Sequence, residues 1–172
     1  MDIEMEIKYK IENINVKKRL KELGAVKVRE TRQVDIYLDH PCESFAEKDK
    51  ALRIRIENGR AELTYKGPRR ECEAKVREEI NVGVSNPMLI LTLLLRLGFK
   101  EVARVFKYRE EYELEGIKVF VDTVKNLGKF IEIEFDEERK NKVEDLVKKL
   151  KLKKENEIKD TYLELLLTKR SL

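Results

Sequence analysis

The N-terminal segment carries three ionisable residues at a spacing suited to holding a metal ion and a phosphate chain. Polar and apolar residues alternate from Ile3 to Tyr9, which is the pattern of a half-buried β-strand. Because successive side chains of a strand point to opposite faces, Glu4, Glu6 and Lys8 share one face, with neighbours about 6.6 Å apart. The two carboxylates can hold one hard cation directly or through its waters, and the ammonium can meet an anion that the cation brings. The pattern leaves open both a metal and polyphosphate site and a solvated outer face of an edge strand.

The composition is that of a highly charged chain of single-domain size. With 172 residues, the chain is long enough for one domain with a sizeable core, and we expect a single domain over residues 1–172. The 38 basic and 34 acidic residues leave a net charge of only +4, so binding to nucleic acid is not indicated. Lys and Glu dominate while Gln occurs once, a balance typical of thermophile proteins and also compatible with ordinary solubility.

The other reactive residue types argue against several classes of site. Cys42 and Cys72 have no second cysteine or histidine at metal-ligand spacing, so neither a zinc site nor a disulfide framework is indicated. His40 is the only histidine and stands in a polar segment, so a Ser-His or Cys-His catalytic pair is not expected. No leader opens the chain, and the apolar run from Met88 to Leu95 is too short to span a bilayer. We therefore expect a cytoplasmic protein that does not bind membranes.

Alternation and turn residues place strands and helices along the chain. Residues 34–39 alternate like the first strand, and Asn58-Gly59 is a favoured two-residue turn for a β-hairpin. Capping signals and the glycines Gly24 and Gly98 bound two short helices. The expected strands are 3–9, 27–38, 51–57, 62–66, 74–84, 102–114, 117–122, 129–135 and 161–167, and the expected helices are 16–23, 87–96 and 137–151.

Most of these strands carry aliphatic residues on one face and residues of both charges on the other. A closed antiparallel β-barrel, with helices on its aliphatic outside and a hydrophilic tunnel inside, would account for this pattern. A triphosphate with one or two divalent ions would then satisfy both kinds of charge in the tunnel. The alternative is a sandwich with one salt-bridged face toward solvent. The inward bases would be Lys8, Arg53, Arg55, Lys66, Arg77, Lys107 and Arg109, and the inward acids Glu4, Glu6, Glu79, Asp122, Glu132 and Glu134.

Five motifs stand in order along the chain. They are Glu4-x-Glu6-x-Lys8; Leu52-Arg53-Ile54-Arg55 with Tyr65-Lys66-Gly67; Lys107-x-Arg109; Asp122 with residues 127–134; and Tyr162-Leu163-Glu164-Leu165. This series resembles the CYTH superfamily, also called triphosphate tunnel metalloenzymes, which contains class IV adenylyl cyclases and thiamine triphosphatases. The resemblance covers nearly the whole chain and implies an α+β fold with an eight-stranded tunnel. In one departure, the family's R-x-E-x-E reads Arg77-x-Glu79-x-Asn81, and a neutral amide is a poorer metal ligand.

Residue roles follow from this resemblance and from the chemistry of phosphoryl transfer. We expect Mg²⁺ or Mn²⁺ to be bound by Glu4, Glu6, Glu132 and Glu134, and secondarily by Glu79 and Asp122. The triphosphate would lie against Lys8, Arg53, Arg55, Lys66, Arg77, Lys107 and Arg109. Lys8 and Asp122 are the expected catalytic residues; Asp122 would bind the metal or orient the attacking oxygen.

Three functions remain open on the sequence. A metal-dependent triphosphatase would use water to cleave a phosphoanhydride bond of inorganic, nucleoside or thiamine triphosphate. A class IV adenylyl cyclase would use the ribose 3′-hydroxyl of ATP and release cyclic AMP and pyrophosphate, whereas a non-catalytic polyphosphate or nucleotide binder would need the bases but not the metal. The assigned residues are expected to contact phosphate or metal, and none of them is recognisably suited to binding adenine. We therefore favour the triphosphatase. We expect it to be a monomer or homodimer that binds a small-molecule triphosphate.

Overall fold

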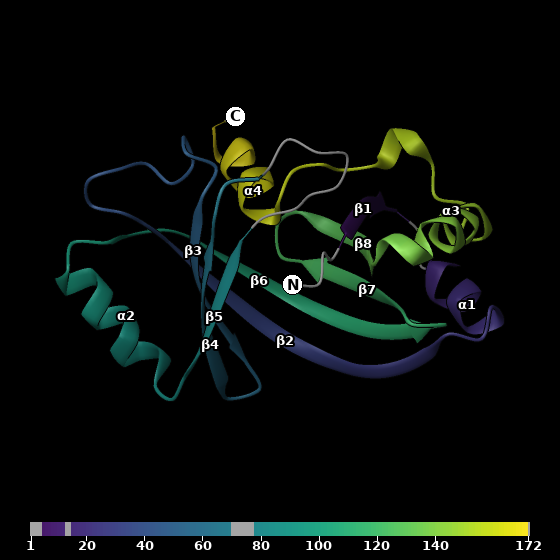
Figure 1. Ribbon diagram of the computed structural model, residues 1–172, viewed down its shortest axis with the longest axis horizontal. Helices are drawn as coiled ribbons and strands as arrows, with labels where there is room; N and C mark the ends of the chain where they lie inside the picture. The colour runs from purple at the N-terminus through teal and green to yellow at the C-terminus, as the bar shows by residue number, and fades with distance from the viewer. Residues whose placement is uncertain (1–4, 13–14, 70–77, 172) are drawn as a thin grey trace. The chain divides into compact units, whose positions relative to one another are not determined.

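A computed structural model of the chain describes residues 5–12, 15–69 and 78–171 (Figure 1). The strands in these residues are β1 (Met5–Ile11), β2 (Val26–Asp39), β3 (Ala51–Glu57), β4 (Arg60–Lys66), β5 (Glu79–Val84), β6 (Lys100–Leu114), β7 (Ile117–Val124) and β8 (Gly128–Phe135). The α-helices are α1 (Asn15–Glu22), α2 (Pro87–Arg96), α3 (Lys140–Lys149) and α4 (Tyr162–Arg170), with 3₁₀ turns η1 (Glu137–Arg139) and η2 (Lys154–Asn156). Over this part of the chain, no helix has both the length and the hydrophobicity to cross a membrane.

The alternating segments form strands as predicted, and the last predicted strand is wrong. The hairpin turn at Asn58-Gly59 is confirmed, since both residues have the positive φ angles, 48° and 77°, that such a turn requires. Residues 161–167, predicted as a strand, belong instead to helix α4. This segment contains four Leu, a residue that favours helices, and a short apolar run does not distinguish the two structures by periodicity. Residues 74–77 of the strand predicted over 74–84 lie outside the described residues.

The eight strands form one sheet in the order β1-β8-β7-β6-β2-β3-β4-β5. In the residues that the structure describes, β1 and β5 are the outer strands and do not pair with each other, so the predicted closed barrel is wrong. Closure requires strand tilt and stagger to bring the two edges together, and alternation of charge does not report either quantity. Alternation reports only which side chains share a face, and that part of the prediction is confirmed by the register of the strands.

The chain divides into two compact units. Unit 1 comprises Met1–Thr31 and Lys107–Thr161, and unit 2 comprises Arg32–Phe106 and Tyr162–Leu172. The long strands β2 and β6 contribute residues to both units. The expectation of one domain over residues 1–172 stays a prediction.

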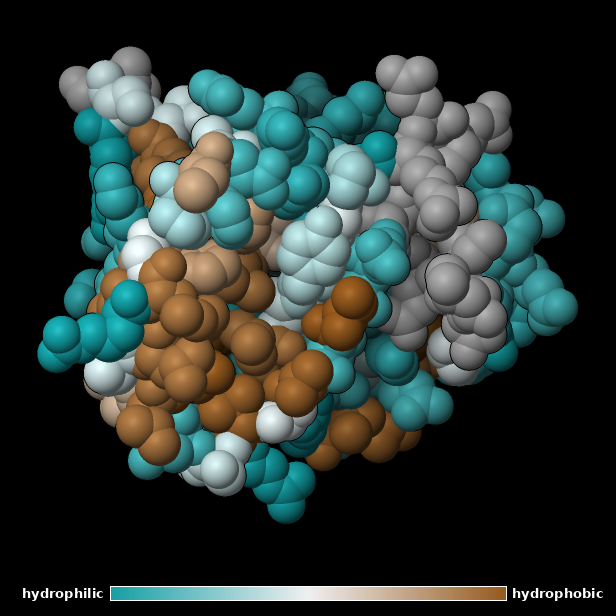
Figure 2. Space-filling model, turned by 60° about the vertical axis from the view of Figure 1, so that its left-hand side comes forward, coloured by the Kyte–Doolittle hydropathy of each residue, from teal (hydrophilic) through white to brown (hydrophobic). Residues whose placement is uncertain are grey.

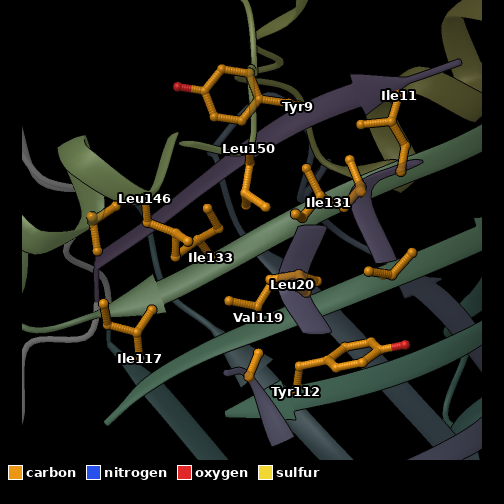
Figure 3. Close-up of a cluster of buried hydrophobic side chains, with 14 residues drawn as sticks. Tyr9, Ile11, Leu20, Tyr112, Ile117, Val119, Ile131, Ile133, Leu146 and Leu150 are labelled. Atoms are coloured by element: carbon orange, nitrogen blue, oxygen red, sulfur yellow. The ribbon is translucent and has the colours of Figure 1, made fainter. Parts of the chain in front are cut away.

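The core of unit 1 lies between one face of its sheet and the helices α1 and α3 (Figure 3). Ile131 and Ile133 of β8 and Val119 of β7 are fully buried on this face. Leu20 of α1 and Leu150, the residue directly after α3, are also fully buried and pack into the same cluster. Burying each such side chain stabilises the fold by about 1.5–3 kcal/mol. The helices therefore hold the apolar face inside, and Asp122, Glu132 and Glu134 of the same strands lie on the opposite face.

The core of unit 2 is built in the same way on a different set of strands. Ile36 of β2 and Ile54 of β3 pack with Leu91 and Leu94 of α2. Helix α2 begins after Asn86, whose side chain accepts hydrogen bonds from the backbone N–H groups of Met88 at 3.1 Å and Leu89 at 3.0 Å. As in unit 1, the polar residues of these strands lie on the face away from the apolar cluster.

Candidate functional site

The register of β1 with β8 places the predicted site residues of unit 1 on one face. Glu6 lies opposite Glu134, and Lys8 lies opposite Glu132. Directly opposed residues of an antiparallel pair project to the same side of the sheet. Glu6 and Lys8 of the first motif therefore lie beside the two glutamates of the Glu-Ile-Glu sequence of β8. Glu4 lies outside the described residues.

Strands β7 and β6 extend this charged face. Asp122 of β7 lies opposite Arg109 of β6, and Glu132 of β8 lies opposite Phe120 of β7. The Arg109 guanidinium lies 4.3 Å from the centre of the Phe120 ring, an arrangement that favours a cation over an aromatic face. Lys107 is buried and occupies the same face as Arg109, two residues away.

Five of these side chains form a continuous ionic cluster across the four strands. Lys8 Nζ lies 3.5 Å from Glu6 Oε1 and 3.3 Å from Glu132 Oε1. Arg109 donates two hydrogen bonds to Asp122, from Nε at 2.8 Å and from Nη2 at 2.6 Å. Arg109 Nη2 also donates to Glu132, which joins the two halves of the cluster. The cluster formed by Glu6, Lys8, Arg109, Asp122 and Glu132 is referred to below as the unit 1 cluster.

Most of the charged side chains in the unit 1 cluster are buried. Asp122 is 0% exposed and Lys8 is 3% exposed, so each charge has lost most of its water. Burial alone would lower the pKa of Lys8, but attraction by Glu132 and Glu6 outweighs it and raises that pKa above its usual value. Lys8 is therefore a fixed cation at neutral pH. It also donates a hydrogen bond to the backbone carbonyl of Asp160 at 3.3 Å, which helps to fix its position.

Glu6 of the unit 1 cluster and Glu134, which lies opposite it, are carboxylates that solvent can reach. The Glu6 side chain is 33% exposed and Glu134 is half-buried, in contrast to Glu132 and Asp122. In the described residues, no group of three or more His, Cys, Asp or Glu side chains is placed to hold a metal ion. Two carboxylates nevertheless fit Mg²⁺, because this ion is usually bound by one or two carboxylates, with the remaining positions taken by waters and substrate phosphates.

Unit 2 carries a second set of bases on its polar face. Arg55 donates to Asp35 through both Nε and Nη2, each at 2.7 Å, so its guanidinium is held in one orientation. Arg53 is buried and donates from Nη2 to Thr64 Oγ1 at 3.2 Å. For Arg53 Nε, the described residues provide no hydrogen-bond acceptor. A buried donor without an acceptor is costly, which marks this position as a place where a ligand oxygen would be favourable.

The other predicted residues of unit 2 lie around these arginines. Lys66 of β4 forms an ion pair with Glu79 of β5 at 2.6 Å. Asn81 lies opposite Thr64, so the residue that replaces a family carboxylate faces the same side as Arg53. Arg77 lies outside the described residues. Each unit thus carries part of the predicted site residues on its own polar face.

Several other polar residues on these faces were not among the predicted site residues. In unit 2 they are Asp35, Thr64 and Gln33. Gln33 is buried and donates a hydrogen bond from Nε2 to Glu57. Its Oε1 has no hydrogen-bond partner in the described part of the chain. Asp35 and Tyr37 alternate with Val34, Ile36 and Leu38, so the signal for their shared face was present. Burial raises the pKa of Tyr37, with a further contribution from the charge of Asp35. In unit 1 the sequence did not indicate that Phe120 would lie under the guanidinium of Arg109, because aromatic residues are common in β-strands.

Comparison with known proteins gives consistent matches over the chain. The family described as the CYTH domain matches residues 2–162. A protein of Methanocaldococcus jannaschii named "Putative adenylate cyclase" is 41% identical over 171 residues, which are 95% of this chain and 98% of that protein. A solved structure from Pyrococcus horikoshii has a TM-score of 0.85 at 39% identity and covers 97% of this chain and 99% of its own.

A more distant solved structure shares the fold. This Hippeastrum protein is described as a "putative adenylyl cyclase" that has a dominant triphosphatase activity. It has a TM-score of 0.73 at 16% identity and covers 98% of this chain and 96% of its own. At this identity the similarity concerns the fold alone.

Proposed function

The chain belongs to the CYTH domain family, and from this premise we propose that it is a divalent-metal-dependent triphosphatase, which cleaves a phosphoanhydride bond of a bound triphosphate. The observation that carries the proposal is the buried Arg53 guanidinium, whose Nε has no acceptor in the described residues. A phosphate oxygen is the strong anionic acceptor that such a donor lacks. The cytoplasmic location expected from the sequence is part of this proposal.

The bases bind and orient the phosphate chain. Lys8 is held in place by Glu6, Glu132 and the carbonyl of Asp160. A cation that is fixed before the substrate arrives does not need to reorganise when charge builds on a phosphate oxygen, which is the main source of electrostatic catalysis. We assign contact with phosphate oxygens also to Lys107 of unit 1 and to Arg53, Arg55 and Lys66 of unit 2.

Asp122 is best explained as a positioning residue. Both of its carboxylate oxygens accept hydrogen bonds from Arg109, which fixes the plane of the guanidinium. Arg109 also bonds to Glu132, so its direction is set from two strands. We therefore propose that Asp122 acts through Arg109, rather than as a metal ligand or as the group that orients the attacking oxygen.

Carboxylates that solvent can reach would hold the metal. Glu6 and Glu134 lie opposite each other on β1 and β8. We propose that they bind Mg²⁺ or Mn²⁺, and that the more buried Glu132 is a further ligand. When bound, the ion supplies neutralising charge for the phosphate oxygens. Glu4 and Arg77 keep their predicted roles as parts of the proposal.

A class IV adenylyl cyclase is the second candidate. The name of the Methanocaldococcus jannaschii relative, at 41% identity, favours it. The triphosphatase is favoured by the residues themselves, because those with assigned roles are suited to phosphate or metal and none to adenine. The activity described for the Hippeastrum protein is compatible with this order but belongs to a distant relative. A non-catalytic binder of polyphosphate is the third candidate.

Product identification separates these candidates. Purified protein is given inorganic triphosphate or ATP, with Mg²⁺ or Mn²⁺, and the products are identified. We expect cleavage of inorganic triphosphate to pyrophosphate and phosphate, because this substrate has no ribose and cannot be cyclised. Formation of cyclic AMP from ATP with inorganic triphosphate left intact would instead establish the cyclase. Binding of both compounds without turnover by any divalent ion would establish the binder.

A matched pair of variants tests the metal assignment. Glu6→Gln should lower metal-dependent turnover at least 100-fold, because the amide is a poor ligand for a hard cation. Its thermal midpoint should change by only a few degrees, since the Glu6 side chain is partly exposed and lies 3.5 Å from Lys8. Glu144→Gln is the control, because Glu144 is an exposed residue of α3. Equal turnover by the two variants would refute the role of Glu6.

A further inference from the structure

Helix α2 is apolar on its outer as well as its inner face. Its sequence PMLILTLLLR has one charged residue, Arg96, although 42% of the whole chain is charged. Leu91 and Leu94 are buried against the core of unit 2. Met88, Leu89 and Leu93 point away from that core and are 50% to 65% exposed. A helix that is hydrophobic all round is normally covered on all sides.

Strand β5 adds to this exposed surface. Ile80 lies opposite Tyr65 and Val82 lies opposite Leu63, so both are on the face of the sheet that α2 packs against. They are 51% and 54% exposed, because β5 is an outer strand of the sheet. Only Ser85 and Asn86 separate β5 from α2. The apolar surface therefore continues from the strand to the helix.

Seven residues define this surface, which we name the α2 patch: Ile80, Val82, Met88, Leu89, Leu93, Leu95 and Leu97. Figure 2 shows a broad hydrophobic area on the side of the molecule that carries α2. The exposed fractions of the seven residues correspond to about 700 Å² of accessible surface, near the roughly 800 Å² that each partner buries in a standard-size interface. A typical monomer has a largest apolar patch of about 300–600 Å².

We propose that the α2 patch is covered by the α2 patch of a second copy of this chain, in a two-fold symmetric homodimer. Two-fold contacts join identical surfaces, so each surface must complement itself. The seven residues of the α2 patch are all aliphatic or Met and meet this condition among themselves, and the exposed Arg96 of α2 is the charged residue that lies beside them. Homodimer interfaces are also more apolar than the interfaces of transient complexes. A charged partner would lose water from its polar groups and receive no acceptor or donor in return.

Sedimentation velocity over about 1–100 μM protein tests the proposal. We expect the unaltered chain to be a dimer at the upper end of this range. The variant Leu89→Glu with Leu93→Glu should sediment as a monomer, with the dissociation constant raised at least 100-fold, because four unpaired carboxylates would be buried per dimer. Both leucines are at least half exposed, so the double variant should keep its circular dichroism spectrum and its turnover of inorganic triphosphate.

The control is Val26→Glu with Val28→Glu on β2, outside the α2 patch. These valines are 66% and 51% exposed, and the same number of charges is introduced. We expect this variant to remain a dimer. A monomeric unaltered chain at 100 μM would overturn the proposal and leave the patch for a different protein or a membrane surface. A dimer that survives Leu89→Glu with Leu93→Glu would overturn it as well, since the interface would then lie elsewhere.

Discussion

At the scale of single residues, the carboxylates of the unit 1 cluster differ in how they are held. Asp122 is completely buried and receives two hydrogen bonds from Arg109, whereas Glu6 is partly exposed. The sequence placed these residues on one face correctly, because alternation fixes direction. It did not reveal which of these carboxylates would accept hydrogen bonds from an arginine, since that depends on the register between the strands.

Arg109 should be essential for the stability of unit 1. Arg109→Met would leave the buried charge of Asp122 without its partner, and removing one member of a buried pair costs about 3–5 kcal/mol. We expect that loss in the free energy of unfolding, measured in urea at pH 7. Arg104→Met is the control, because the Arg104 pair with Glu101 is at the surface and should contribute less than about 1 kcal/mol. A loss of similar size in both variants would contradict the importance given to burial.

Glu110 should make stability depend on pH. It is buried on the core side of β6, where Lys17 and Lys27 contact it, the latter at 2.9 Å. Burial alone would raise the pKa of Glu110, but the two lysines outweigh burial and lower it. A carboxylate with a lowered pKa stabilises the fold above its unfolded pKa of 4.5, and this contribution is lost as pH falls through the folded value.

The variant Glu110→Gln tests whether the pKa of Glu110 is lowered in the folded protein. At pH 7 it should have a lower free energy of unfolding than the unaltered chain, and the difference should shrink as the pH falls below 4.5. Glu144→Gln on the surface of α3 should show no such trend. A difference that grows toward acid pH would mean that burial dominates and that the pKa is raised. Glu110 was not among the residues predicted from the sequence, because it lies on the apolar side of its strand.

At the scale of elements, alternation and caps predicted most of the fold. The strands β1 to β8 and the helices α1 to α3 lie close to the predicted ranges. Helix α4 lies where a strand was predicted over residues 161–167, a short and largely apolar segment. Such short segments are decided by packing, which the local pattern does not contain.

The N-cap of α2 offers a test of local sequence signals. Asn86→Ala removes the side chain that accepts from Met88 and Leu89, and should lower the free energy of unfolding by about 1 kcal/mol. Asn86→Asp should lower the free energy of unfolding much less, since Asp is an equally good N-cap residue. Urea unfolding of the two variants compares them directly. An alanine variant as stable as the aspartate variant would show that the cap does not stabilise α2.

At the scale of the whole molecule, the charged faces and the apolar patch suggest different partners. The faces that carry Lys8 and Arg109 in unit 1 and Arg53 in unit 2 suit an anion, and the α2 patch suits a second copy of the chain. The closed tunnel predicted from the charge pattern is not present, because β1 and β5 remain unpaired edges over the described residues. Closure is a property of the complete sheet, and no single strand encodes it.

Binding of inorganic triphosphate, measured by titration calorimetry in EDTA, tests the central claim most directly. Without divalent ions, only the bases hold the anion, so binding is separated from turnover. We predict one triphosphate per chain and an affinity that falls as salt rises. Arg53→Met should weaken binding at least tenfold, because a charged hydrogen bond contributes about 1.5–3 kcal/mol. Arg104→Met should bind as the unaltered chain does. No binding by the unaltered chain at millimolar triphosphate, or equal binding by the two variants, would contradict the account.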